Sequence, residues 1–356
     1  MGQPAQAEPE LAVSVVMPVL NEARDIGGVL FKVLSQRCPS AGFEVLVVDG
    51  GSVDDTRAIV SELADEWPNL RLIENPGKLS SSGRNIGARA ARGRYILYLD
   101  GHCSVPRNDY LVRLVELFES TGAACLCRPQ PLNHLAEGTW ATAISAARHS
   151  WLGHNAGSDI YSDKPGFTDP HSAGAAYLRT VIEQLSGYDE RFDACEDVEF
   201  NHRVAMAGHR SYLHPDLTVY YRVRSTPRGL FRQMVRYGRG RARLMAKHRR
   251  LVPWPLVMIT AIGVVAVAGF VGGRAAVTSP FLGISLGAWL LVAAIESFRL
   301  SRGLPAALRH LTAFFVIHAG LLIGFLNGIA GAGAFLARPS GGSRWAVTGS
   351  VDKPST

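Results

Sequence analysis

Two short acidic signatures in this chain have residue types and positions that suit chemistry on a phosphate-bearing substrate. The first runs from Asp100 to His102 and directly follows an apolar run over 95–99. A carboxylate at the end of a strand can hold a metal ion or a nucleotide. The second, Glu196-Asp197, can supply a general base. A basic stretch and long apolar segments follow, so we expect an enzyme that uses an activated, phosphate-bearing donor beside a bilayer.

The second signature also has a structural interpretation. Glu196 and Asp197 begin a helix-like stretch over 198–207, and carboxylates at a helix N-terminus gain stability from the helix dipole. Consecutive helical residues point about 100° apart, so only one of the two can face a substrate. Their order in the chain, after Asp100 and before the apolar segments, favours catalysis.

The elements that must position these residues alternate along the chain. Helix-like stretches near 23–36, 55–66 and 80–92 separate short apolar runs at 13–17, 44–48, 70–74, 95–99 and 123–127. Such alternation predicts an α/β fold with a mostly parallel sheet and right-handed crossovers. Ligands of open sheets bind at the carboxyl ends of the strands.

Further polar residues follow these predicted strands. Asp49 ends the second strand, where its carboxylate suits a base or ribose, and a turn-forming Asp before two glycines is an equally good interpretation. Lys78 or Arg84 could lie near a pyrophosphate; alternatively the glycines at 83 and 87 serve close helix–sheet packing. The chain has no Walker loop and no GxGxxG after the first strand, which disfavours an NTPase or a Rossmann dehydrogenase.

Charge and cysteine usage limit the class of protein. The net charge of +7 is concentrated, because residues 222–250 hold eleven Lys or Arg and no acidic residue. Five cysteines without CxxC spacing argue against a disulfide scaffold or a zinc ribbon and fit reduced thiols. The first ten residues lack the basic region of a signal peptide.

Three apolar segments are long enough to cross a membrane, at about 254–273, 275–295 and 311–337. The flanking Arg clusters predict three spans over 251–337 and a cytoplasmic N-terminal domain at 12–225. Residues 1–11 and the tail 338–356 are predicted to be disordered.

The basic segment 226–250 precedes the first of these apolar stretches. Its mixture of apolar and basic residues predicts an interfacial amphipathic helix whose cations meet anionic lipid. Gly238 and Gly240 interrupt the pattern and suggest two pieces. Nucleic-acid binding is the competing interpretation, and the position beside a membrane segment argues against it.

An ordered set of short motifs covers roughly residues 12–240: Pro18-x-x-Asn21-Glu22, Val48-Asp49-Gly50-Gly51-Ser52, Gly83-Arg84-Asn85-x-Gly87, Asp100-Gly101-His102, Glu196-Asp197 and Gln233-x-x-Arg236-Tyr237. This set resembles the inverting family 2 glycosyltransferases with a GT-A fold, and among them membrane-anchored bacterial enzymes of the succinoglycan-biosynthesis ExoA type. The resemblance implies a Rossmann-like GT-A domain followed by transmembrane helices in the bacterial inner membrane.

The resemblance also implies roles at the matching positions. Asp49 would contact the uracil or ribose of a UDP-sugar, in a pocket that Pro18, Asn21 and Glu22 line. Lys78, Arg84 and Asp100 belong to the same nucleotide-sugar site. Asp197 would be the base, with Glu196 beside it, and Gln233, Arg236 and Tyr237 would lie on the acceptor or lipid side.

Two positions depart from the family pattern. Asp100 and His102 occupy the metal-binding D-x-D positions, and imidazole suits Mn²⁺ better than Mg²⁺. A divalent cation, Mn²⁺ or Mg²⁺, is therefore expected. Tyr237 replaces the Trp of processive synthases, and its ring can still stack on an acceptor sugar.

The resulting hypothesis is an inverting transfer of one sugar from a UDP-sugar, such as UDP-glucose, to a lipid-linked saccharide in exopolysaccharide or cell-surface glycan biosynthesis. Membrane lipids are the other expected partner, and nucleic acid is not expected. Two alternatives stay open: a polyprenyl-phosphate sugar synthase, and a non-catalytic membrane scaffold that binds nucleotide-sugar. A transporter fits less well because the apolar segments carry almost no polar residues.

Overall fold

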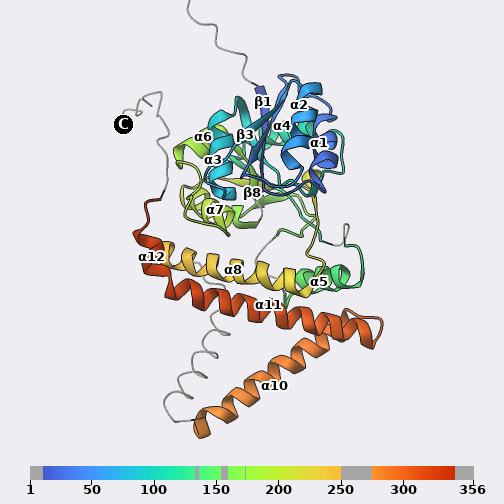
Figure 1. Ribbon diagram of the computed structural model, residues 1–356, viewed down its shortest axis with the longest axis vertical. Coiled ribbons are helices and arrows are strands. Elements are labelled where there is room, and N and C mark those ends of the chain that lie inside the picture. Colours follow the sequence, from blue (N-terminus) through green and yellow to red (C-terminus); the bar gives the residue numbers. More distant parts are fainter. Residues whose placement is uncertain (1–10, 133–135, 154–158, 173, 250–274, 341–356) are drawn as a thin grey trace, which may run out of the picture.

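The computed structural model describes residues 11–132, 136–153, 159–172, 174–249 and 275–340 (Figure 1). The strands are β1 Leu11–Val19, β2 Phe43–Asp49, β3 Leu70–Glu74, β4 Gly93–Tyr98, β5 Cys103–Ser104, β6 Cys125–Cys127, β7 Gly166–Thr168, β8 Gly174–Leu178, β9 Ser211–Leu213 and β10 Tyr220–Tyr221. The helices are α1 Ile26–Leu34, α2 Thr56–Glu66, α3 Ser80–Ala90, α4 Tyr110–Thr121, α5 Thr139–His149, α6 Arg179–Gln184, α7 Glu196–Met206, α8 Pro227–His248, α10 Ala275–Arg299, α11 Leu304–Ala330 and α12 Ala332–Ala337. Short 3₁₀ turns cover Pro170–Ser172 and Pro215–Leu217.

The predicted α/β fold with a mostly parallel sheet is confirmed. Eight strands form one sheet in the order β3-β2-β1-β4-β8-β6-β9-β7, in which β3, β2, β1 and β4 are parallel. Strand β8 runs antiparallel between β4 and β6. The carboxyl ends of β1, β2, β4 and β6 therefore meet at one edge of the sheet, where the predicted site residues lie.

Alternation along the strands builds a core on each face of the sheet. Val13, Val15 and Met17 of β1 pack with α1 and α4 on one face, while Val16 packs with α3, α6 and α7 on the other. Helices thus cover both faces of the sheet (Figure 1), which explains the continuous apolar runs of the central strands.

Helix α3 approaches the sheet through glycine, as the structural interpretation predicted. A Cβ on Gly87 would lie 2.3 Å from Cγ1 of Val16, and one on Gly83 would lie 3.0 Å from Cβ of Pro18. Only glycine leaves room for this contact. The close approach brings the first turns of α3, including Arg84, to the carboxyl edge of the sheet.

Below the α/β body, α8 lies parallel to α11 (Figure 1). A Cβ on Gly324 of α11 would lie 2.0 Å from the Val235 carbonyl oxygen, and one on Gly238 of α8 would lie 2.1 Å from that of Leu321. Small residues permit this close backbone approach. The predicted interruption of 226–250 at Gly238 and Gly240 is therefore wrong: α8 is continuous, because both glycines are buried contact positions.

The three predicted membrane segments have different outcomes in the structure. Residues 254–273 lie outside the described residues. A helix, α10, occupies the second range, and the third, 311–337, divides into α11 and α12 at Gly331. Within the described ranges, α11 alone passes the length and composition test for a membrane-spanning helix.

Candidate active site

The loops after β1 and β2 interlock at the carboxyl edge of the sheet. The backbone N–H of Asn21 donates to Oγ of Ser52 over 2.8 Å, and the N–H of Val53 donates back to Oδ1 of Asn21 over 2.9 Å. Asn21 has a φ of +56°, a conformation that Asn tolerates better than most residues. Asn21 therefore holds the loop after β1 against the loop after β2, and Pro18 lies beside it at the end of β1.

Asp49 is held within its own turn. Its carboxylate accepts hydrogen bonds from the N–H groups of Gly51 and Ser52 and from the Ser52 hydroxyl, and it pairs with Arg57 over 3.2 Å. The side chain is fully buried. This geometry is that of the turn-forming residue, and contact with a nucleotide base stays a prediction.

Asp100 follows β4 and faces Arg84 of α3. Nη2 of Arg84 lies 3.4 Å from Oδ1 of Asp100, and its Nε lies 3.9 Å from Oε1 of Glu196. Burial alone would raise the pKa of Asp100, but the positive charges of Arg84 and His102 hold it below its ordinary value. Arg84 thereby brings the two acidic signatures of the sequence to one place.

His102 is bound to the first loop through Glu22. Its Nδ1 lies 2.9 Å from Oε1 of Glu22, whereas its Nε2 is buried without a hydrogen-bond partner. Burial lowers the pKa of His102, but the bond to Glu22 and the charge of Asp100 raise it above its ordinary value. The Asp100 carboxylate and this unpartnered nitrogen are donors that fit a divalent cation such as Mn²⁺. The described side chains contain no complete cluster of three metal-ligating groups.

The second signature begins α7 as predicted. The residue before it, Cys195, has a φ of +62°, a strained backbone conformation for a residue with a Cβ. Glu196 is mostly buried, and burial together with neighbouring Asp197 raises its pKa. Asp197 is exposed, and its Oδ1 accepts the N–H of Val198 at the helix N-terminus. The two carboxylates thus have different surroundings.

Helix α8 brings the third predicted motif to the same region. Nε2 of Gln233 donates to the Tyr237 hydroxyl over 3.3 Å, and Oε1 of Gln233 is buried without a partner. Burial raises the pKa of Tyr237, an effect that the charge of Arg148 opposes and that of Asp197 increases. Tyr237 therefore lies within electrostatic reach of Asp197.

Several cations of α8 face the protein, which differs from the prediction that they meet lipid. Arg236 donates to the Asp193 carbonyl over 2.6 Å, and Arg239 and Arg243 pair with the Asp193 carboxylate. Acidic residues of the segment before α7 bind these cations because α8 lies between the α/β body and α11. Arg232, near the N-terminal end of α8, stays exposed.

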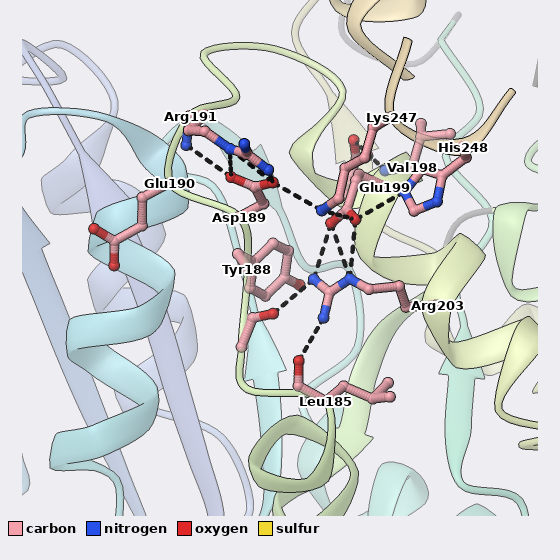
Figure 2. Close-up of polar contacts among 12 residues, drawn as sticks. Leu185, Tyr188, Asp189, Glu190, Arg191, Val198, Glu199, Arg203, Lys247 and His248 are labelled. Carbon is pink, nitrogen blue, oxygen red and sulfur yellow. Dashed lines mark hydrogen bonds and ion pairs between the residues drawn. The ribbon is translucent and has the colours of Figure 1, made fainter. Parts of the chain in front are cut away.

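A buried charge cluster fixes the C-terminal end of α8 to α7 (Figure 2). The fully buried carboxylate of Glu199 accepts hydrogen bonds from Arg203, from Lys247 over 2.6 Å and from Nε2 of His248 over 3.0 Å. Lys247 also pairs with Asp189 over 2.7 Å. Burial would raise the pKa of Glu199, but these three partners lower it strongly.

One predicted residue lies apart from these contacts, and two unpredicted ones lie among them. Lys78 is exposed, with a φ of +60°, and its backbone packs against Gly50 at the end of β2. Arg128 directly follows β6 at the carboxyl edge, and Arg148 lies on α5. The position of Arg128 after a predicted strand is a signal that sequence reasoning could have used; Arg148 carries none.

The chain has relatives among known proteins. Residues 14–186 match the family model of glycosyl transferase family 2. The chain is 33% identical over 239 residues, 67% of this chain and 71% of the relative, to the succinoglycan biosynthesis protein ExoA of Rhizobium meliloti. It is 22% identical over 253 residues, 68% of this chain and 76% of the relative, to a dolichyl N-acetyl-glucosaminyl phosphate diacetamido-dideoxy-glucuronosyltransferase of Methanococcus voltae.

A solved structure has the same fold. The mannosyltransferase PcManGT of Pyrobaculum calidifontis, in complex with GDP-mannose and Mn²⁺, superposes with a TM-score of 0.57. It is 21% identical, and the match covers 92% of this chain and 90% of that chain. The likeness confirms the predicted GT-A fold.

Proposed function

As a member of glycosyl transferase family 2 this chain is a glycosyltransferase, and we propose that it transfers one sugar, with inversion, from a UDP-sugar such as UDP-glucose to a lipid-linked saccharide. The observation that carries the proposal is the position of Arg84, whose guanidinium contacts both Asp100 and Glu196. It brings a nucleotide-side carboxylate and the residue before the candidate base, Asp197, from distant parts of the sequence to one edge of the sheet.

Asp197 is the proposed general base. It takes the proton of the acceptor hydroxyl as that oxygen forms a bond to the anomeric carbon. The bond from the anomeric carbon to the diphosphate breaks on the opposite side, and the diphosphate leaves with the electron pair. Without a protein nucleophile the displacement takes one step and inverts the configuration. The exposed position of Asp197 supports this role, because an acceptor must reach it.

The other residues position the reactants. The loops around Asn21 and Asp49 form the nucleotide side, and Gln233 and Tyr237 form the acceptor side, where the tyrosine ring can stack on a sugar. Asp100 and Nε2 of His102 would hold a divalent cation, which when bound neutralises charge on the diphosphate. The mannosyltransferase PcManGT, which has the same fold, was solved with GDP-mannose and Mn²⁺, which supports the use of a divalent cation.

Membrane attachment is the second part of the proposal. One face of α11 packs on α8, and the opposite face exposes apolar side chains, among them Leu308, Phe315, Leu326 and Ile329. We infer that α11 lies along the cytoplasmic surface of a bacterial inner membrane. Helix α10 precedes α11 and lies at an angle to it (Figure 1). It also exposes apolar side chains, and we infer that it enters the bilayer.

The test is nucleoside diphosphate release by the purified protein in lipid nanodiscs with Mn²⁺, across UDP- and GDP-sugars and bacterial lipid-linked oligosaccharide. Release with one donor that requires both the acceptor and Asp197 supports the proposal. Release that needs only polyprenyl phosphate favours the polyprenyl-phosphate synthase. Nucleotide binding without turnover of any donor favours the non-catalytic scaffold.

A further inference from the structure

A cavity of about 570 Å³ lies between α5 and the end of α10. Thr142, Ser145 and His149 of α5 line it together with Trp151 and Arg299. Its volume falls within the range of roughly 300–1,000 Å³ that is typical of small-molecule sites. No residue to which the proposed transfer assigns a role lines this cavity, so its polar groups need a separate explanation.

The hydroxyl of Ser145 points to a ligand in this cavity. Ser145 is 2% exposed, and its Oγ has no hydrogen-bond partner within the described part of the chain. The neighbouring hydroxyls are satisfied, because Thr142 donates to the Gly138 carbonyl over 2.9 Å and Ser150 donates to the Ala147 carbonyl over 2.8 Å. Burial of a hydroxyl without a partner is costly. We therefore expect a bound group that accepts a hydrogen bond from Ser145.

Arg299, the last residue of α10, offers further donors to the same cavity. Its Nε and Nη2 bind the two carboxylate oxygens of Glu296 over 2.6 and 2.7 Å, which leaves Nη1 available. The Glu296 side chain is only 3% exposed, and both of its oxygens are occupied by this pair. The residues that line the cavity include no acidic side chain. The cavity therefore suits an anion better than a cation.

The position of the cavity indicates the source of such an anion. Ala147 of α5 and Phe314 of α11 belong to one apolar cluster, so α5 lies against α11 near the turn that joins it to α10 (Figure 1). Because the proposed function places α11 along the membrane surface and α10 in the bilayer, this turn lies at the level of the lipid head groups. Trp151 is 60% exposed, and Trp is enriched at that level of a membrane.

We propose that this cavity binds the phosphate group of an anionic phospholipid, such as phosphatidylglycerol, with Ser145 and Arg299 as donors to the phosphate oxygens. Guanidinium groups form strong, charge-assisted hydrogen bonds to phosphate. A zwitterionic lipid would bring an ammonium group to a lining without a carboxylate. The inference rests on the membrane attachment in the proposed function and is independent of the sugar transfer. It gives the attached protein a preference for one class of lipid.

The test measures complexes of the full chain with lipid by native mass spectrometry from detergent micelles. Phosphatidylglycerol is compared with phosphatidylcholine of the same acyl chains and with soluble glycerol 3-phosphate. We expect a one-to-one complex with phosphatidylglycerol that is roughly 10-fold tighter than either of the other complexes. Arg299→Gln should reduce the affinity for phosphatidylglycerol to that for phosphatidylcholine, and Ser145→Ala should remove part of the difference.

Arg302→Gln is the matched control, because Arg302 is exposed three residues further along and does not line the cavity. Ala146→Leu fills the cavity from α5 and keeps both donors, so it should also weaken the phosphatidylglycerol complex if Arg299→Gln does not fold. Thermal unfolding in the same detergent shows which variants are folded.

Three results would overturn the inference. They are equal affinities for the two lipids, a phosphatidylglycerol complex that both cavity variants leave unchanged, and an equal loss of affinity in Arg302→Gln. Glycerol 3-phosphate that binds as tightly as the lipid would also overturn it, because the site would then take a soluble phosphate ester. Flotation of the wild-type protein with phosphatidylcholine vesicles tests the membrane attachment separately. Flotation without lipid preference would therefore contradict the inference and keep the proposed function.

Discussion

At the scale of single residues, the adjacent carboxylates of α7 should differ in their effect on catalysis. Burial raises the pKa of Glu196, whose carboxylate faces Arg84, whereas Asp197 is exposed to an acceptor. We expect Asp197→Asn to lower kcat by roughly 1,000-fold, in the range of general base catalysis, and Glu196→Gln to lower it much less. Steady-state kinetics at pH 7 with equal nucleotide affinity is the measurement. A larger loss for Glu196→Gln would reverse the assignment.

The same scale shows what the sequence can predict of the site. Asp100 and Glu196 stand at the end of a strand and the start of a helix, positions that local patterns reveal. Their joint contact with Arg84 depends on how α3 packs on the sheet. The position of Arg148 is harder still to predict, because its charge acts on Tyr221 and on Tyr237 of α8, which are distant in the sequence, and no local pattern carries that information.

At the scale of elements, the charge cluster between α7 and α8 makes stability depend on pH. The pKa of Glu199 is lowered in the folded protein, so its stabilisation is present above its unfolded value and is lost as pH falls. Glu199→Gln removes the buried carboxylate that Arg203 and Lys247 share, while Lys247 keeps its pair with Asp189, and it should cost about 3 kcal/mol at pH 7.

Denaturant unfolding of both proteins from pH 7 to pH 3 measures this effect. The difference in unfolding free energy should shrink as the pH falls below about 4, because the unfolded wild-type carboxyl then binds a proton. Met206→Gln is a control at the exposed C-terminal end of the same helix, and it keeps Glu199 and its three partners. A difference that stays constant with pH would show that Glu199 acts through packing.

The glycine contacts of the helix pair give a second prediction at this scale. A Cβ on Gly324 would meet the backbone of Val235, which cannot move like a side-chain end. Gly324→Ala should therefore destabilise the protein by about 2 kcal/mol and raise the KM for acceptor, since α8 carries Tyr237. Gly333→Ala is the control, because no atom lies within 4 Å of its added Cβ. Equal thermal unfolding and equal KM for the two variants would contradict the packing account.

The elements also show which structural features local sequence patterns cannot predict. Apolar runs locate β1 to β4 because central strands are buried on both faces. The continuity of α8 is not local information: Gly238 is a helix breaker in isolation and a contact residue beside Leu321, more than eighty residues later. The ion pairs between the α8 cations and Asp193 likewise depend on a residue that is distant in the sequence.

At the scale of the whole molecule, the packing of α8 against α11 limits the orientation that α11 can have relative to a bilayer. The contacts of Gly320 with Met234 and of Gly328 with Ala242 keep the two helices side by side. Helix α8 is also bound to the α/β body through Asp193 and Glu199. A perpendicular α11 would draw these charged groups into hydrocarbon, which is costly. Length and composition alone predict a span, and the neighbouring helix argues for a surface position.

A surface position of α11 predicts equal depths along its exposed face. Single cysteines at Leu308, Phe315, Leu326 and Ile329, in a Cys38→Ser background, can carry spin labels, because the other four native cysteines are buried. Depth follows from relative accessibility to oxygen and to a nickel chelate in nanodiscs. We expect the four labels at similar shallow depths. A spanning helix would instead place the first and last about 30 Å apart across the bilayer, at 1.5 Å per residue. That gradient would contradict the surface position and restore the predicted span.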